Sequence, residues 1–437
     1  MSDPLLRSAY SLALNAVVTA GLGIAFWVVA ARLYDPVALG RDAALIAVML
    51  ELSTICQLNM ANAITRFLPS LARGTKGALL RAYGTSAAAA LVAGLAFVLV
   101  APAVSHEFDF VGGDWRLAAL YVLALVAWGW FSLQDAALTA VRRAPWVPVE
   151  NGVFGLLKLA ALPLFLALGT GDGVFLAWTV PVLLLIVPVN LFLFRTAIPE
   201  HVRANKPAGS AVLDRLGRRG FVRFMAQDYG ATVLALAPTA VLPVLIVALL
   251  GPGANAYFFI PYSMVGAFNM LFFAASMSLV AEGALAEDRI RAMAERLARR
   301  FALILTAGMV VMIAAAPLIL LPFGEDYVRE SSSVLRVLAC GSAFYAVIAL
   351  YVGIARLRGR SGGILAVEAA KLPLLLGGVV TLSGPLGIEG VALAWVCSVA
   401  LVALAVTPSL LRFFRTPPAR EARVRPMAAV PKRARLQ

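Results

Sequence analysis

The feature that most constrains this chain is a succession of long apolar runs separated by short polar connections. An α-helix rises 1.5 Å per residue, so about 20 apolar residues cross the ~30 Å hydrocarbon core of a membrane. We count twelve such runs in the 437 residues and therefore expect an all-α integral membrane protein of about 12 transmembrane helices. The expected spans are 10–31, 43–65, 82–104, 117–140, 152–169, 174–194, 225–250, 254–280, 301–323, 335–355, 362–382 and 390–411.

The composition agrees, with 62% hydrophobic and only 14% charged residues. The net charge of +14 comes from basic residues spread over the connections rather than gathered on a soluble domain. Anionic membrane lipids are therefore expected partners, and nucleic acid is not. The three cysteines lie inside apolar runs without metal-site spacing, so we expect no metal and no cofactor.

The basic residues also orient the helices, because Lys and Arg concentrate on the cytoplasmic side of a membrane. Twelve spans place both termini on one side. With that side cytoplasmic, most of the 37 basic residues fall in cytoplasmic tails and connections, five lie outside, and two, Lys158 and Lys371, fall within spans. We expect a bacterial cytoplasmic-membrane protein with both termini cytoplasmic. The five outer residues are Arg32, Arg41, Arg116, Arg329 and Arg336.

An internal repeat divides the chain into two halves of six helices. The segments 173–178 and 390–395 both begin Gly-Val and end Ala-Trp, at an offset of 217 residues, and three further pairs match, one at an offset of 217 and two at an offset of 216. The expected parts are a cytoplasmic N-terminus at 1–9, an N-lobe at 10–209, a C-lobe at 210–413 and a basic disordered tail at 414–437. The matching pairs are Arg195 and Arg412, Arg7 and Arg223, and Pro36 and Pro252.

Two like-oriented bundles would enclose a central cleft and could rock around it, as in transporters built from parallel repeats. The alternative is that the duplication only builds a large bundle. Gly21 and Gly23 in span 1 and Pro238 in span 7 occupy comparable heights in the two halves. They are hinge candidates because glycine loosens a helix and proline removes a backbone hydrogen bond, although close packing and a fixed kink are equally open explanations.

Charged residues within the membrane usually face a partner or a wet cavity. Lys158 on span 5 and Lys371 on span 11 occupy equivalent helices of the repeat, and a pair of cations beside a cleft would suit a phosphate or diphosphate headgroup. Structural pairing is the alternative, since Asp135 lies at a similar depth to Lys158 and Glu368 precedes Lys371 by three residues. Snorkelling to the interface is a third possibility.

Span 2 carries a polar stripe, because Glu51, Asn59, Asn62 and Arg66 fall on one face of a continuous helix. Lipid would not accept that face, so it is expected to line the cleft or to bond to a neighbouring helix. Asp228 in span 7 is a further candidate for ion coupling.

Several stretches together resemble the polysaccharide and oligosaccharide flippases, of the lipopolysaccharide or O-antigen export type, within the multidrug/oligosaccharidyl-lipid/polysaccharide exporter superfamily. They cover nearly the whole chain in order. In this sequence they read Ala-Arg-Leu-Tyr-Asp-Pro at 31–36, Ala-Ile-Thr-Arg-Phe-Leu-Pro at 63–69, Gly-Glu-Asp-Tyr at 324–327, Val-Leu-Arg-Val-Leu-Ala at 334–339 and Gly-Ile-Glu-Gly-Val-Ala-Leu-Ala at 387–394.

The resemblance implies a V-shaped pair of six-helix lobes that moves a lipid-linked saccharide, carried on a polyprenyl diphosphate, across the membrane by alternating access. Arg66, Lys158 and Lys371 are the basic residues that could serve the cleft. Two alternatives stay open: a cation-coupled drug or small-molecule antiporter on the same scaffold, and a membrane glycosyltransferase using Glu107 and Asp109 of an outer loop. No P-loop, HExxH or GxSxG motif is present, so we expect no enzyme.

Overall fold

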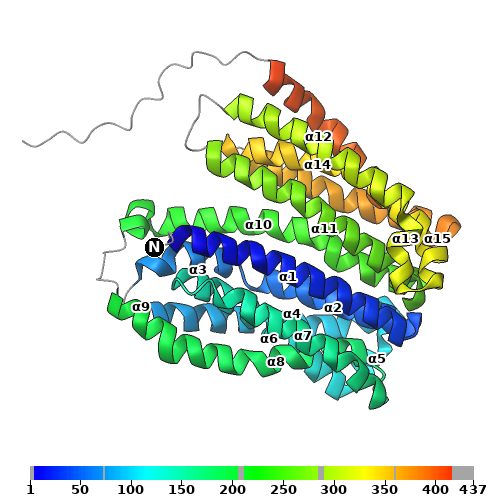
Figure 1. The fold of residues 1–437 in the computed structure, drawn as a ribbon, viewed down its shortest axis with the longest axis horizontal. Coiled ribbons are helices and arrows are strands. Elements are labelled where there is room, and N and C mark those ends of the chain that lie inside the picture. The colour runs from blue at the N-terminus through cyan, green and yellow to red at the C-terminus, as the bar shows by residue number, and fades with distance from the viewer. Residues whose placement is uncertain (1–3, 72–73, 205–210, 284–289, 359–360, 416–437) are drawn as a thin grey trace, which may run out of the picture.

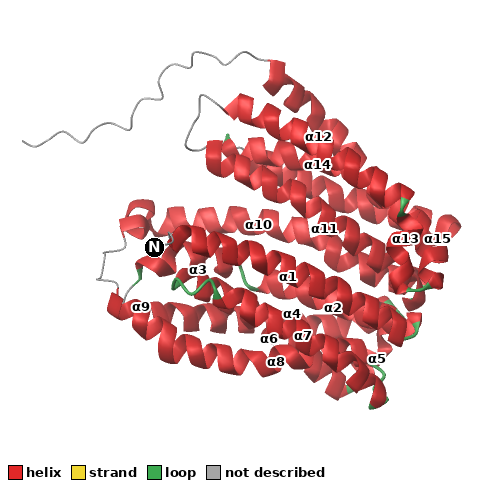
Figure 2. Ribbon diagram, viewed as in Figure 1, coloured by secondary structure: helices red, strands yellow, loops and turns green. Residues whose placement is uncertain are grey.

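The computed structural model describes residues 4–71, 74–204, 211–283, 290–358 and 361–415, with the backbone alone at 4–13, 70, 110, 211–228, 231, 278–283, 290–292 and 361. Every regular element in these ranges is helical (Figures 1 and 2). The first half contains α1 (Pro4–Leu33), α2 (Pro36–Cys56), α3 (Met60–Phe67), η1 (Leu68–Ser70), α4 (Thr75–Val104), η2 (His106–Phe108), α5 (Asp109–Gly113), α6 (Trp115–Ala140), α7 (Trp146–Ala167), α8 (Gly173–Phe192), η3 (Leu193–Ala197) and α9 (Ile198–Ala204). The second contains α10 (Ala211–Leu250), α11 (Pro252–Gly283), α12 (Ile290–Ala314), α13 (Ala316–Leu320), η5 (Leu321–Phe323), α14 (Glu325–Leu357) and α15 (Ser361–Arg415).

Among the described residues, ten helices are long and apolar enough to cross a membrane, and the bent pair α2 and α3 makes eleven. One of the ten is α15, whose 55 residues would extend roughly 80 Å at 1.5 Å per residue. Its backbone leaves the helical region at Gly387, where φ is 56° and two helices meet. Counting these two helices separately gives the twelve crossings expected from the sequence. The start of α1 and the end of α15 lie toward the same end of the bundle (Figure 1).

The polar stripe expected along span 2 is interrupted. Leu58 and Asn59 adopt positive φ angles of 50° and 62°, and α3 leaves the direction of α2 by 51°. Positive φ is uncommon for residues other than glycine and ends a helix locally. The expectation of one continuous face from Glu51 to Arg66 was therefore wrong, because it assumed an unbroken helix of constant pitch.

The structure also differs from the sequence-based expectation for the segment before span 9. The segment 282–300 has apolar and basic residues at near-helical spacing, which favours a separate helix on the membrane surface. Residues 284–289 lie outside the described ranges, but the rest of the segment from Ile290 belongs to α12 and continues into the membrane-crossing helix. The basic tail beyond Arg415 also lies outside the described residues, as does the boundary at 209–210.

Helices pack mainly within their own half of the chain. In the first half α1 packs on α7, α7 on α8 and α4 on α6, and in the second half α11 packs on α14 and α14 on α15. The halves meet where α2 packs against α10 and α11. One buried apolar cluster runs through both halves, from Phe26 and Leu45 to Ile246 and Leu338.

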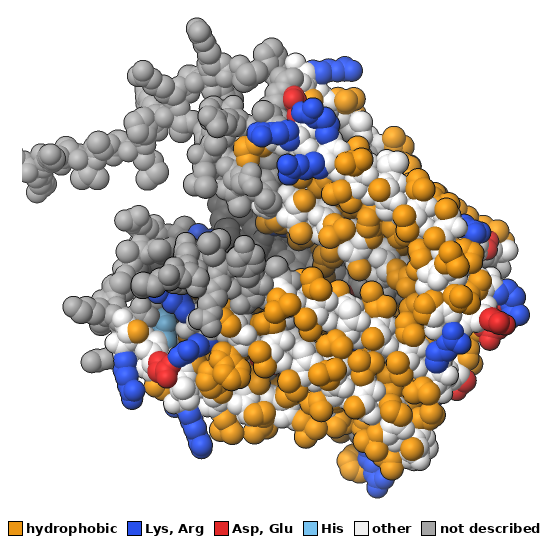
Figure 3. All heavy atoms as spheres, viewed as in Figure 1, with side chains coloured by type: hydrophobic (Ala, Val, Ile, Leu, Met, Phe, Trp, Pro, Cys, Tyr) orange, Lys and Arg blue, Asp and Glu red, His pale blue; other side chains and the backbone are white. Residues whose placement is uncertain are grey.

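The outer surface matches a membrane environment. Figure 3 shows hydrophobic side chains over the middle of one face, with Lys, Arg, Asp and Glu concentrated toward its two ends. Large apolar side chains such as Leu99 on α4 and Leu303 on α12 are 77% and 73% exposed. Water would penalise this much exposed apolar surface, whereas lipid solvates it. The chain is a multi-pass membrane protein.

The two halves are bonded together at the end remote from the termini. The Arg32 guanidinium donates to the carbonyl oxygens of Leu321 and Pro322, at 2.8 and 2.7 Å. Close by in the fold, the buried Asn255 side chain donates to the Gly40 carbonyl at 2.7 Å. In Figure 1 the ribbons of the two halves are close together at this end and diverge toward the end that carries the N-terminus.

A buried carboxyl group anchors α8 at the same end. Asp42 of α2 is fully buried, and its Oδ2 accepts hydrogen bonds from the backbone N–H groups of Val174 and Phe175, both at 3.0 Å. These are among the first N–H groups of α8, which have no partner within their own helix. The neighbouring Arg41 forms an ion pair of 3.0 Å with Asp172, just before α8. Sequence patterns gave no signal for Asp42, because its partners lie 132 and 133 residues away.

We expect Asp42→Ala to destabilise the protein by about 1–3 kcal/mol, because two buried N–H groups lose their acceptor. Asp42→Asn is the matched control, since its amide oxygen can still accept. The midpoint of thermal unfolding in detergent should fall clearly for the alanine variant and less for the asparagine variant. Equal midpoints for Asp42→Ala and the unmodified protein would show that the two bonds contribute little.

Candidate functional site: a cavity beside Lys371

The second half of the chain contains a cavity of about 660 Å³. Its walls come from α10, α11, α14 and α15, and α2 of the first half closes one side with Ala47, Leu50 and Glu51. This volume lies within the range of small-molecule sites, about 300–1,000 Å³. Because α2 packs against α10 and α11, movement between the halves would change the shape of the cavity.

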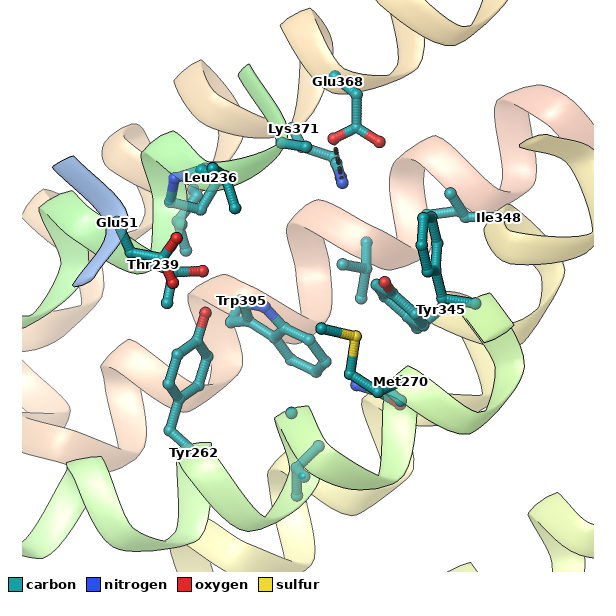
Figure 4. A pocket seen from close by; sticks show the side chains of 18 of the residues that line it. Glu51, Leu236, Thr239, Tyr262, Met270, Tyr345, Ile348, Glu368, Lys371 and Trp395 are labelled. Atoms are coloured by element: carbon teal, nitrogen blue, oxygen red, sulfur yellow. Dashed lines mark ion pairs between the residues drawn. The ribbon is translucent and has the colours of Figure 1, made fainter. Parts of the chain in front are cut away.

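Lys371 and Glu368 line this cavity from α15, and they are paired. Residues three apart on a helix lie on the same face, and the Lys371 ammonium is 2.5 Å from the Glu368 carboxylate. Their side chains are only 13% and 10% exposed. The ion pair suggested by the sequence spacing is thus present, and Figure 4 shows it at one side of the cavity. The pair neutralises two buried charges and leaves the other lysine N–H groups for a ligand.

Glu51 enters the cavity from the opposite side. In Figure 4 its carboxyl group lies close to Thr239 and to the hydroxyl end of Tyr262. Among the described residues, none of the ion pairs includes Glu51. The buried Asn269 also lines the cavity, and its Oδ1 has no hydrogen-bond partner. The site therefore offers a carboxylate and an amide oxygen that can accept hydrogen bonds from a ligand.

Aromatic rings and one further cation complete the lining. Tyr262, Tyr345 and Trp395 face the same space (Figure 4). Arg356, near the C-terminal end of α14, lines the cavity and lies over the Phe273 ring with 5.8 Å between its guanidinium carbon and the ring centre. Apolar walls with a few polar groups are typical of ligand sites.

Lys158, the counterpart of Lys371 in the repeat, is placed differently. Its ammonium lies over three rings: Trp178 at 3.8 Å, Phe26 at 4.8 Å and Phe154 at 5.0 Å from the ring centres. The side chain is buried, and Lys158 is not among the residues lining the cavity. Among the described residues no ion pair joins Asp135 to Lys158, and Asp135 accepts a hydrogen bond from Asn151. The alternative of an Asp135–Lys158 ion pair was therefore wrong.

We expect Lys158→Met to leave the thermal stability unchanged or raised. Methionine fills a similar volume without the cost of burying a charge, and rings repay only about 2 kcal/mol of that cost. A cation kept in such a place is a candidate for function rather than stability. The midpoint of thermal unfolding of the variant in detergent tests this expectation. A clearly lower midpoint would assign Lys158 a packing role.

Three further candidates are not among the residues that line this cavity. Asn59, Asn62 and Arg66 sit around the α2–α3 bend, where Asn62 Nδ2 donates to Asn59 Oδ1 at 2.5 Å, and none lines the cavity. Asp228 belongs to α10, at a position where only the backbone is described. Its role stays a prediction.

The hinge candidates differ in their surroundings. A Cβ at Gly21 or Gly23 would have no neighbour within 4 Å, so close packing does not explain these glycines. Both lie within the single helix α1. Pro238 lies inside α10 and lines the cavity, so bending there would alter the site directly.

The acidic residues of the outer loop, Glu107 and Asp109, lie outside the lining of the cavity. Glu107 belongs to η2 and Asp109 begins α5, and neither is a lining residue. The Asp109 carboxyl lies 3.2 Å from the His106 ring nitrogen, and both side chains are largely exposed. This is the arrangement of a solvated turn.

Comparison with known proteins supports a transporter fold. Neither a protein-family model nor a curated protein sequence matches the chain. An inward-facing multidrug resistance MATE transporter of the MOP superfamily aligns with 92% of this chain and 100% of its own, at 14% identity and a TM-score of 0.64. The lipid II flippase MurJ, in an inward closed conformation, aligns with 93% of this chain and 87% of its own, at 14% identity and a TM-score of 0.65.

The chain shares its overall fold with these two solved transporters, of which the MATE protein belongs to the MOP superfamily. An outward-facing MATE transporter of the same superfamily fits less closely, with a TM-score of 0.57 at the same 14% identity over 95% of this chain and 98% of its own.

Proposed function

We propose that this protein flips a lipid-linked saccharide across the bacterial cytoplasmic membrane by alternating access, with both termini in the cytoplasm. The observation that carries the proposal is the combination of groups in the cavity: a carboxylate outside the ion pairs of the described residues, an amide oxygen without a hydrogen-bond partner, aromatic faces and two cations. Sugar hydroxyls can donate to Glu51 and Asn269, and the apolar face of a sugar ring can pack on Trp395 or Tyr262.

The diphosphate would lie between Lys371 and Arg356. Both are donor-only cations, and charge-assisted hydrogen bonds to phosphate oxygens are about twice as strong as neutral ones. A volume of about 660 Å³ suits a short saccharide headgroup, while a polyprenyl chain is too long to enter and would stay in lipid. The order of family-like motifs along the chain supports the same substrate class.

Alternating access would use the contact between the halves. In the conformation described here, Arg32 and Asn255 hold the halves together at the outer end, so the headgroup would enter from the cytoplasmic end. Breaking these bonds and closing the cytoplasmic end would release it on the other side. The N-lobe (10–209) and C-lobe (210–413) are the two bodies proposed to move.

The test is transfer in proteoliposomes. A polyprenyl-diphosphate saccharide is placed in one leaflet, and the appearance of its sugar in the other is followed by binding of a lectin that cannot cross the membrane. We expect transfer to be much faster with the protein than in protein-free vesicles. No acceleration with any saccharide tested would overturn the proposal.

A drug or small-molecule antiporter is the second candidate. A site for organic cations requires a carboxylate in an apolar cavity. Glu51 is such a carboxylate, and among the described residues no ion pair includes it. In the same vesicles, this function predicts uptake of a fluorescent organic cation that stops when the ion gradient is removed. Saccharide transfer without such uptake favours the flippase.

A further inference from the structure

Two carboxyl groups lie together on the α6–α7 hairpin, away from the cavity. Glu150 is 5% exposed, and its Oε1 accepts a short hydrogen bond from Gln134 Nε2. One position further along each helix, Asp135 Oδ2 accepts from Asn151 Nδ2 at 2.9 Å. Both bonds join α6 to α7, and their partners are neighbours in sequence on each helix, so the two pairs sit side by side across the hairpin.

The second oxygen of each carboxyl group has no partner. Glu150 Oε2 and Asp135 Oδ1 are buried and make no hydrogen bond. The two groups interact electrostatically with each other, and no ion pair in the described part of the chain includes either. A buried carboxylate without a cation costs several kcal/mol, and two neighbouring carboxyl groups do not both ionise readily.

The helix α4 carries the cations Lys76 and Arg81, but among the described residues no cation forms an ion pair with Asp135 or Glu150. α4 contributes Tyr83, which interacts electrostatically with both carboxyl groups. α8, and α1 between Leu14 and Ala31, contain no charged residue. The charged groups of the other neighbouring segments include Glu51 on α2, Arg66 on α3 over Phe67, Arg142 and Arg143 of the hairpin turn, Glu200 and Arg203 on α9, Lys158 on α7 in its aromatic cage, and Arg195 on η3. Of these, Arg143 forms an ion pair with Glu200.

A chain of hydrogen bonds leads from Glu150 to Tyr83. Gln134 Oε1 accepts from Asn190 Nδ2 at 2.8 Å, and Asn190 Oδ1 accepts from the Tyr83 hydroxyl at 2.9 Å. The chain thus joins α7, α6, α8 and α4. Just beyond Asn190, η3 is a π-helical turn, a rare geometry that often marks functional sites.

A proton fits this site better than a metal ion. The amide oxygens of Gln134 and Asn190 already accept hydrogen bonds, and hard cations such as Ca²⁺ require about six to eight oxygen ligands. In the described part of the chain, no group of three His, Cys, Asp or Glu residues could hold a metal. One added proton, by contrast, would remove a buried charge and turn the acceptor Glu150 Oε1 into a donor.

We propose that Asp135 and Glu150 form a proton-binding site whose occupancy sets the direction of the hydrogen-bond chain to Tyr83. When water delivers a proton to Glu150 Oε1, the new O–H donates to Gln134 Oε1 after the amide turns over. Gln134 Nε2 then donates to Asn190 Oδ1, and Asn190 Nδ2 to the Tyr83 oxygen, which can accept as well as donate. On release the proton returns to water, and no other covalent bond changes.

Only the role of this proton site rests on the proposed function: the site would couple transport to a proton gradient. Reversing the chain changes the bonds between four helices of the first half at once, including the π-helical end of α8. Proton binding at the hairpin could therefore bias the position of this half without touching the substrate.

The experiment is infrared difference spectroscopy on the purified full-length protein in lipid nanodiscs, recorded at neutral pH. We expect a C=O band from a protonated carboxyl group that is lost in both Glu150→Gln and Asp135→Asn. Glu200→Gln, which removes an exposed carboxylate, is the matched control and should keep the band. Asp135→Asn retains an acceptor for Asn151, so it provides a folded variant if Glu150→Gln does not assemble.

Absence of the band in the unmodified protein, or its persistence in both variants, would overturn the proton site and leave the proposed transport function standing. The measurement needs no substrate. A band that behaves as expected, in a protein that fails the saccharide assay, would keep the site and reject the flippase. Tyr83→Phe should shift the band without removing it, because it breaks only the far end of the chain.

Discussion

Gly40→Ala is expected to lower the transfer rate by about 5- to 150-fold and to open the end remote from the termini. A Cβ at Gly40 would lie 1.8 Å from the Pro252 carbonyl oxygen and 2.8 Å from the Ala256 nitrogen, both backbone atoms that cannot turn aside. Overpacking of this kind costs about 1–3 kcal/mol, and 1.4 kcal/mol changes a population tenfold. Alanine favours a helix over glycine, so any loss must come from the contact and not from α2 itself.

The matched control is Gly253→Ala in the same interface, where the added Cβ would be 3.7 Å from Val37, an ordinary contact. Spin labels on exposed Leu168 and Leu318, in a background lacking Cys56, Cys340 and Cys397, report the distance between the halves at this end. The distance should lengthen in Gly40→Ala and stay unchanged in Gly253→Ala. Unchanged distances and transfer in both variants would show that α2 and α11 need not approach this closely.

Lys371→Met is expected to abolish saccharide transfer and also to destabilise the protein. Without the ammonium, the Glu368 carboxylate stays buried and unpaired, which costs about 3–5 kcal/mol. Adding Glu368→Gln removes that charge, so the double variant should recover much of its thermal stability. Transfer should stay absent in the double variant if Lys371 binds the diphosphate.

Two single variants complete the set. Glu368→Gln leaves the lysine in place and should still transport, and Lys371→Arg should retain part of the rate because a guanidinium also binds phosphate. Initial transfer rates and unfolding midpoints are measured on the same preparations. If the double variant recovers transfer together with stability, the Glu368–Lys371 pair is only structural and the cavity loses its proposed phosphate site.

The sequence alone was sufficient to predict the fold class. Apolar runs of membrane-spanning length and short connections leave few other structures, and the comparison structures agree with the resulting fold. The Glu368–Lys371 pair was also predictable, because residues three apart on one helix are neighbours whatever surrounds them.

Contacts between distant segments were not predictable. Asp42 caps α8, Asn255 reaches Gly40, and Gln134 connects Glu150 to Asn190, yet no sequence pattern relates these positions. The repeat suggested equal roles for Lys158 and Lys371, but tertiary packing surrounds Lys158 with three rings and gives Lys371 a carboxylate and a cavity. Small differences between the two halves decide these environments.

What the sequence determined by itself is local and periodic: which segments are apolar enough and long enough to enter lipid, because each helix satisfies its own backbone hydrogen bonds there. What only the tertiary structure decided is which polar groups meet inside the bundle. That depends on the rotation and bending of each helix, as the 51° break after α2 illustrates, and these are set by contacts between side chains far apart in the chain.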